Sequence, residues 1–161
     1  MKYLMVAVAA WVELVCAACA DPAIDAAKFQ AVDRAARSVQ LELHTIDSSS
    51  RIAQLIERLQ LEVAALEGRA TGRREAEVLN AYAAAAESYR YLLRFHRLDR
   101  EEVGGKVLLT GANRPIASRY ELPIENRGGG RWVDRTAAMR TFAGRAATEL
   151  DHANRLLLAA P

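Results

Sequence analysis

The chain has almost no cysteine. Its only two cysteines, Cys16 and Cys19, lie in an apolar N-terminal stretch, so residues 21–161 contain no cysteine and no disulfide. The C-x-x-C spacing does not make a haem attachment site, because Ala20 stands where a histidine is required. A zinc site needs further ligands at compatible spacing, and the chain offers no other cysteine. We therefore expect no metal and no cofactor.

Strong charge of either sign is also missing. The chain has 22 basic and 20 acidic residues, for a net charge of +2. This balance argues against nucleic acid as a partner, because such binding requires a concentrated basic face. Only Lys2, Lys28 and Lys106 are lysines, and the other basic residues are arginines. Arginine suits contacts with carboxylate or phosphate, although a GC-rich coding bias produces the same composition.

The longest apolar run, from Tyr3 to Ala20, is short. It follows a single basic residue and ends at Asp21-Pro22, which is the layout of a signal peptide. Ala18-Cys19-Ala20 matches the small-x-small rule and predicts cleavage before Asp21. The run is too short for a comfortable bilayer-spanning helix. Glu13 lies inside this run, where an ionised carboxylate is costly. Because this residue is unusual in a signal peptide, an uncleaved N-terminal helix is kept as an alternative.

A second alternative is a lipoprotein signal that ends before Cys19. Ala17 and Ala18 suit the two positions before a lipidated cysteine, but Cys16 stands where a leucine-like residue is expected. We expect residues 1–20 to be removed by a signal peptidase. The mature protein is then expected to be a bacterial protein that is exported to the periplasm or secreted. Membrane contact is expected only through a lipid on Cys19, in the alternative in which the protein is an anchored lipoprotein.

Residues 21–161 are predicted to form one all-α domain, an antiparallel bundle of about four helices. The expected helices span about 21–44, 49–67, 73–98 and 133–158, with apolar residues three and four apart. The short turns between the first three favour antiparallel packing. The buried stripe predicted for the third helix comprises Val78, Leu79, Tyr82, Ala86, Tyr89, Leu93 and His96.

Residues 99–131 differ in composition from the rest. Their six glycines and two prolines exclude a long helix and predict a long irregular insert between the third and fourth helices. Val107–Leu109 suits a short strand, and residues 115–119 suit one helical turn. Because such a segment in a compact domain is usually functional or disordered, it supplies the candidate ligand- or partner-binding residues. They are Arg114, Arg119, Tyr120, Arg131 and Trp132, although Trp132 has the alternative of capping the core where the last helix begins.

No complete catalytic motif is present. Glu149 and His152 have the spacing of di-iron ligands in helical bundles, but the required second pair is missing. The stretch TIDSSSRIAQLIERLQLEVAAL is similar to the first long helix of chorismate mutases, a resemblance that implies a catalytic arginine and lysine. Arg58 is slightly out of step with that pattern, and Lys28 and Lys106 lie elsewhere.

The favoured hypothesis is an exported, non-catalytic interaction protein with an unknown protein or envelope partner. The alternative is a helical bundle that binds an anionic small molecule through Arg114, Arg119 or Arg131. A helical enzyme ranks below both hypotheses.

Overall fold

Four long helices make up most of the chain in the computed structural model, which describes residues 23–44, 49–98 and 102–159. They are α2 Gln30–His44, α3 Ser49–Leu66, α4 Arg73–His96 and α6 Arg135–Leu158, and a short 3₁₀ helix, η1 Ala26–Phe29, precedes them. The mostly helical character predicted from the sequence is confirmed. No helix in the described ranges has the length and apolarity needed to cross a membrane. The leader, both cysteines and the expected cleavage site lie outside the described residues.

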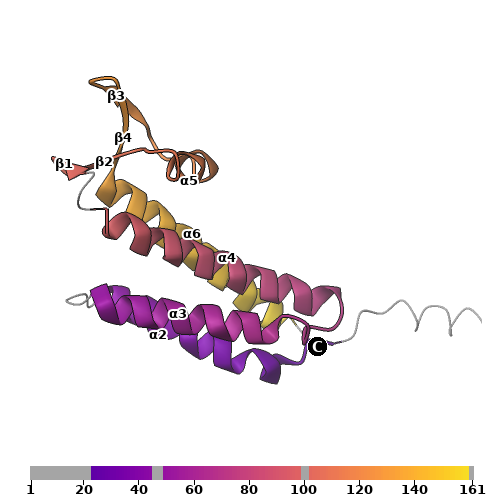
Figure 1. Ribbon diagram of the computed structural model, residues 1–161. Coiled ribbons are helices and arrows are strands. Elements are labelled where there is room, and N and C mark those ends of the chain that lie inside the picture. The colour runs from indigo at the N-terminus through magenta and orange to yellow at the C-terminus, as the bar shows by residue number, and fades with distance from the viewer. Residues whose placement is uncertain (1–22, 45–48, 99–101, 160–161) are drawn as a thin grey trace, which may run out of the picture.

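The long helices pack in pairs, α2 with α3, α3 with α4, and α4 with α6. In Figure 1, α2 and α3 lie together on one side of the α4–α6 pair. Their apolar stripes bury a core that includes Val39, Leu59, Tyr82 and Leu150, one from each long helix. Removing these side chains from water is the main force that holds the helices together.

A small sheet and a short helix cover the end of the α4–α6 pair where α4 ends and α6 begins (Figure 1). The strands are β1 Glu102–Val103, β2 Lys106–Leu108, β3 Glu125–Arg127 and β4 Gly130–Asp134, and the helix is α5 Arg114–Arg119. The sheet is antiparallel, in the order β1-β2-β4-β3. The all-α class predicted from the sequence is therefore confirmed only in part, because a small sheet and a short helix are present where a long irregular insert was expected. Val107 pairs with Val133, and such a distant partner leaves no local pattern in the sequence.

The sheet and α5 share a second core with the adjoining halves of α4 and α6. Its fully buried side chains include Phe95, Leu109, Val133 and Phe142. Leu43 of α2 packs against both cores. The segment between α4 and α6 is thus held against the helices by apolar packing.

The start of the last helix differs from the prediction. Helix α6 begins at Arg135, and Asp134 is its N-cap, with a carboxylate that accepts a hydrogen bond from Ala137 N at 2.7 Å. Trp132 and Val133 belong to β4 instead, and it is Val133 that is fully buried. The interpretation of Trp132 as the residue that opens the helix and caps the core is therefore wrong.

Candidate functional site

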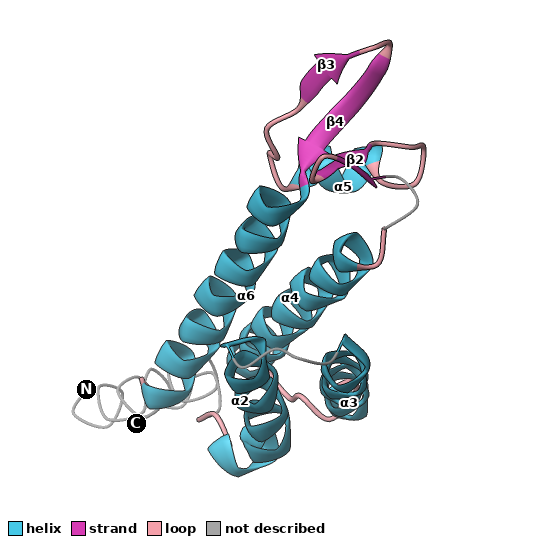
Figure 2. Ribbon diagram, turned by 90° about the vertical axis from the view of Figure 1, so that its left-hand side faces the viewer, coloured by secondary structure: helices cyan, strands magenta, loops and turns pink. Residues whose placement is uncertain are grey.

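The hairpin formed by β3 and β4 projects beyond the rest of the sheet, as Figure 2 shows. Its two strands are joined by Gly128 and Gly129, with φ of 58° and 75°. Two successive residues with positive φ make the turn that matches the natural twist of a hairpin, and glycine adopts it without strain. All three residues of β3 are exposed. The hairpin therefore offers both an edge strand and its side chains to solvent.

The two faces of the sheet have different characters, because side chains alternate along a strand. Val107 and Val133 are paired and fully buried on the face toward the helices. Leu108 and Trp132 are paired on the opposite face, where both side chains are partly exposed. Trp132 is thus a surface tryptophan on a strand and not part of the core.

Gly130 makes room for the indole of Trp132. A Cβ atom at this position would lie 2.8 Å from Leu108 Cδ1 and 2.9 Å from Trp132 Nε1. The indole N–H donates to the carbonyl of Arg127 at 3.0 Å, across the turn of the hairpin. The absence of a side chain at Gly130 therefore leaves room for the ring in the orientation that this hydrogen bond requires.

Substituting Gly130 with alanine should displace the indole and destabilise the protein by about 1–3 kcal/mol, as overpacking does. The effect should appear as a shift in the fluorescence of Trp132, the only tryptophan in residues 21–161. Gly111→Ala is the matched control, because a Cβ at Gly111 meets no atom within 4 Å. Equal fluorescence and stability for the two variants would contradict this account of Gly130.

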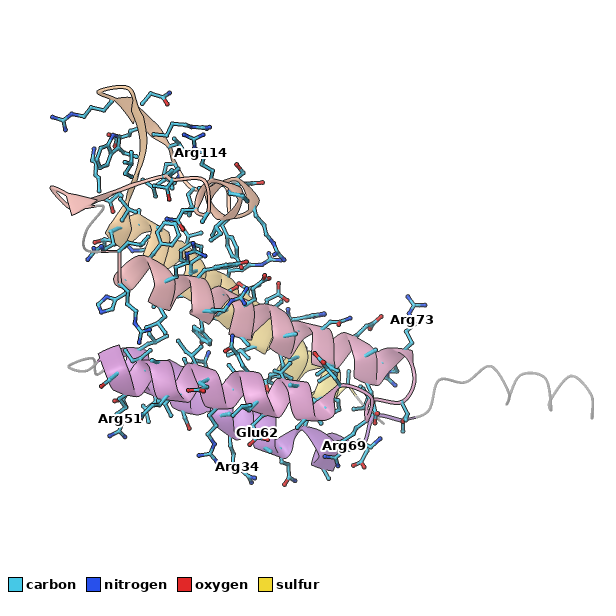
Figure 3. All side chains as sticks on the ribbon, in the orientation of Figure 1. Arg34, Arg51, Glu62, Arg69, Arg73 and Arg114 are labelled. Atoms are coloured by element: carbon cyan, nitrogen blue, oxygen red, sulfur yellow. The ribbon has the colours of Figure 1, made fainter. Side chains whose placement is uncertain are left out.

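Three arginines, two on the hairpin and one on α5, have no carboxylate partner in the described part of the chain. They are Arg114, Arg127 and Arg131, called the sheet arginines below. Arg114 Nε donates to Leu109 O at 3.3 Å, and Leu109 N donates to Arg131 O at 2.8 Å. Arg114 and Arg131 therefore both contact Leu109. Figure 3 shows Arg114 at the sheet end of the molecule. All three side chains are exposed.

The other two predicted residues, Arg119 and Tyr120, belong to a separate cavity of about 310 Å³ between α4, α5 and α6. Arg119 makes a two-pronged contact with Glu87, with both N–O distances 2.9 Å. The charge of Glu87 raises the pKa of Arg119 above its ordinary value. Tyr91 donates to the same carboxylate at 2.9 Å, and the Tyr120 hydroxyl lies 3.1 Å from Ser88 Oγ. These contacts join α5 to α4.

This cavity, called the Glu87 cavity below, contains among its described residues no unpaired cationic side chain that could bind an anion. The guanidinium of Arg119 already pairs with Glu87, and Arg145, which lines the cavity from α6, has a guanidinium nitrogen 2.7 Å from a carboxylate oxygen of Glu149. The structure therefore separates the predicted site residues. Arg114, Arg131 and Trp132 lie at the sheet, whereas Arg119 and Tyr120 lie at the Glu87 cavity.

No group of three or more histidines, cysteines or acidic residues placed to hold a metal occurs in the described ranges. Glu149 pairs with Arg145, and His152 is exposed one turn further along α6. Their i, i+3 spacing in the sequence therefore corresponds to surface positions on a helix.

Sequence reasoning missed the residues that organise the Glu87 cavity, because Glu87 and Ser88 meet Arg119 and Tyr120 only through the fold. It also missed Glu75, a buried carboxylate near the start of α4. Here a signal was available, because Glu75 lies three residues before Val78 on the same helical stripe. A charged residue on an otherwise apolar face suggests a buried ion pair.

Comparison with known proteins adds no functional assignment to this geometry. No family model matches the chain, and no curated protein and no solved structure matches it either.

Proposed function

We propose that this is an exported, non-catalytic interaction protein that binds an acidic protein partner through the β3–β4 hairpin. In this proposal the four long helices form an antiparallel bundle that serves as a scaffold for the sheet. Export rests on the signal-peptide pattern of residues 1–20, with removal before Asp21 or lipidation of Cys19 as the two forms of processing. The intact mass of the protein from its native host distinguishes the two forms from an uncleaved chain.

One observation carries the proposal: the hairpin carries a partly exposed tryptophan and two exposed arginines, Arg127 and Arg131, that have no carboxylate partner in the described part of the chain. Tryptophan and arginine are the residue types most enriched among those that dominate binding energy at interfaces. An unpaired guanidinium forms strong two-pronged hydrogen bonds with a carboxylate. A partner surface with aspartate or glutamate around an apolar contact complements this arrangement.

The structure also limits the choice of variant for a test. Deleting residues 100–131 would remove the buried side chains of Val107, Leu109 and Ile116 and expose the core beneath them. Point substitutions at exposed or partly exposed positions of the hairpin avoid this problem.

The expected result is that the variant with Arg127→Ser, Arg131→Ser and Trp132→Ala loses most of the partner recovered by the wild-type protein from envelope extracts of the native host. The control is Arg34→Ser with Arg58→Ser, two exposed arginines on α2 and α3 whose loss removes the same charge from another face. Recovery should also fall with added salt, which screens exposed charges. Equal recovery by the two variants would refute the hairpin as the contact surface.

The anionic-ligand alternative gains nothing from Arg119, because Glu87 already neutralises that side chain. It gains support from a different set of residues, in an apolar groove on the helices.

A further inference from the structure

An open groove of about 510 Å³ lies between α2, α4 and α6, and no residue of the hairpin lines it. Its walls are mainly apolar and include Leu43, Leu92, Met139 and Ala143. The volume lies within the range of ordinary small-molecule sites, which often occur between the helices of bundles. The groove is distinct from the Glu87 cavity, with which it shares no lining residue.

Small residues on α6 leave this space empty. Ala143, Gly144 and Ala147 all line the groove, and a Cβ built at Gly144 would meet no atom within 4 Å. Gly144 also lacks the positive φ that would require glycine, although glycine weakens a helix interior. The local backbone therefore gives no reason for the glycine, and its visible effect is to keep the groove open.

Tyr89 supplies the polar group inside the groove. The residue is 1% exposed, and burial raises the pKa of its hydroxyl to about 12. Its hydroxyl has no hydrogen-bond partner in the described part of the chain, and the side chain lines the groove. Because this hydroxyl has no partner within the described fold and the side chain lines the groove, it is suited to bond an oxygen of a bound molecule.

Arg140 supplies a charge. It lines the same groove from α6, is exposed to solvent, and makes no ion pair within the described ranges. The other polar residues of the lining, Gln40 and Thr136, are uncharged. The groove thus combines an apolar body, one unpaired positive charge and one hydroxyl without a partner in the described part of the chain.

We propose that this groove binds an amphiphilic carboxylate of the fatty-acid class. The alkyl chain lies against Leu43, Leu92 and Met139, and the carboxylate pairs with Arg140. The hydroxyl of Tyr89 donates a hydrogen bond to an oxygen of the ligand. A neutral amphiphile gains only the apolar contacts, and a cationic one meets the like charge of Arg140.

The test measures binding to the full chain, exported and processed by its host, by calorimetry with three probes below their micelle concentrations. The probes share one alkyl chain and differ in the head group: laurate, dodecanol and dodecyltrimethylammonium. Laurate should bind most tightly and the cationic probe most weakly. Arg140→Gln should weaken laurate binding roughly tenfold, the usual effect of losing a charge-assisted hydrogen bond, and leave dodecanol binding unchanged.

A pair of variants at one position separates loss of the groove from loss of the fold. Gly144→Leu should fill the groove and abolish laurate binding without lowering the melting temperature, since leucine is the better helix former. Gly144→Ala adds one methyl group and should retain binding. Tyr89→Phe should weaken laurate binding with no change in the helical circular dichroism spectrum.

Three results would overturn the proposal. The first is equal binding of laurate and dodecyltrimethylammonium, which would show that Arg140 does not select the charge. The second is laurate binding by Gly144→Leu equal to that of the wild-type protein, which would place the ligand elsewhere. The third is the absence of binding by all three probes. None of these three results would change the partner recovery expected for the hairpin variant, so the groove and the hairpin are tested independently.

Discussion

Replacing Phe142 with alanine is expected to lower the free energy of unfolding by about 3–5 kcal/mol, the range for large aromatic residues removed from a core. Phe142 has no exposed surface and lies where α4, α5 and α6 meet. Its ring centroid is 5.1 Å from that of Phe95 and 4.9 Å from that of Tyr120, both in edge-to-face contact. Truncation therefore removes apolar burial together with these two ring contacts and a third, with Tyr91 at 6.1 Å, and leaves a cavity.

Urea unfolding followed by circular dichroism measures the loss at Phe142. The control is Leu61→Ala on α3, because this leucine is 66% exposed and its truncation should change stability by no more than about 0.5 kcal/mol. The fluorescence of Trp132 supplies a second readout, since the sheet rests on the same core. If Phe142→Ala were no more destabilising than Leu61→Ala, this core would not hold the sheet and α5 on the helices.

Replacing Glu75 with glutamine should cost about 2–3 kcal/mol, because hydrogen bonds to a buried charge are lost. Glu75 Oε1 accepts from Asp25 N at 3.1 Å, Oε2 accepts from Thr71 N at 2.7 Å, and Lys28 Nζ lies 3.0 Å from both oxygens. A glutamine keeps the shape but turns its NH₂ group toward one of these donors. The carboxylate joins η1 to the turn before α4, so the N-terminal end of the described fold should loosen first.

The same carboxylate predicts acid sensitivity. Burial alone would raise the pKa of Glu75, but the hydrogen bonds from Thr71, Lys28 and Asp25 outweigh it and lower the pKa from 4.5 to about 2. The folded state therefore holds the proton less tightly than the unfolded chain. The resulting stabilisation is complete above about pH 4.5 and is lost as the pH falls from there toward 2.

Melting temperatures between pH 7 and pH 2 test both effects. The difference between the wild-type protein and Glu75→Gln should be largest at neutral pH and shrink below about pH 4.5. Glu77→Gln is the control, because Glu77 pairs with Arg73 at 3.3 Å on the helix surface and its loss should matter little. A difference between wild type and Glu75→Gln that stays constant over this range would contradict the assignment of the low pKa to Glu75.

The long helices were largely predictable because their patterns are local. The helix predicted for 49–67 is observed as Ser49–Leu66, and the one predicted for 73–98 as Arg73–His96. The stripe on α4 was correct at Tyr82 and Tyr89 but wrong at its end, where Leu92 and Phe95 are buried in place of Leu93 and His96. The first half of α4 packs in the helical core, whereas its end packs against the sheet, and this change of neighbours turns the buried face.

The candidate site was predictable only as a set of residue types. Arginines and a tryptophan in a glycine-rich segment indicated binding, but nothing local in the sequence indicated which of them lie together. Arg119 is paired because α5 folds back onto α4 and places Glu87 opposite its guanidinium. Arg131 and Trp132 are neighbours in the chain, yet they point to opposite faces of β4 because strand side chains alternate. These relationships depend on contacts between residues far apart in the chain.

The apolar periodicity of residues 23–158 was enough to predict a mostly helical protein, because an amphipathic stripe reflects the burial of one face of a single helix. The sheet, the paired state of Arg119, the surface position of Trp132 and the groove beside Gly144 were decided by the tertiary structure alone. Each of these features arises where segments distant in the chain meet, so its free energy depends on partners that no short stretch of sequence contains.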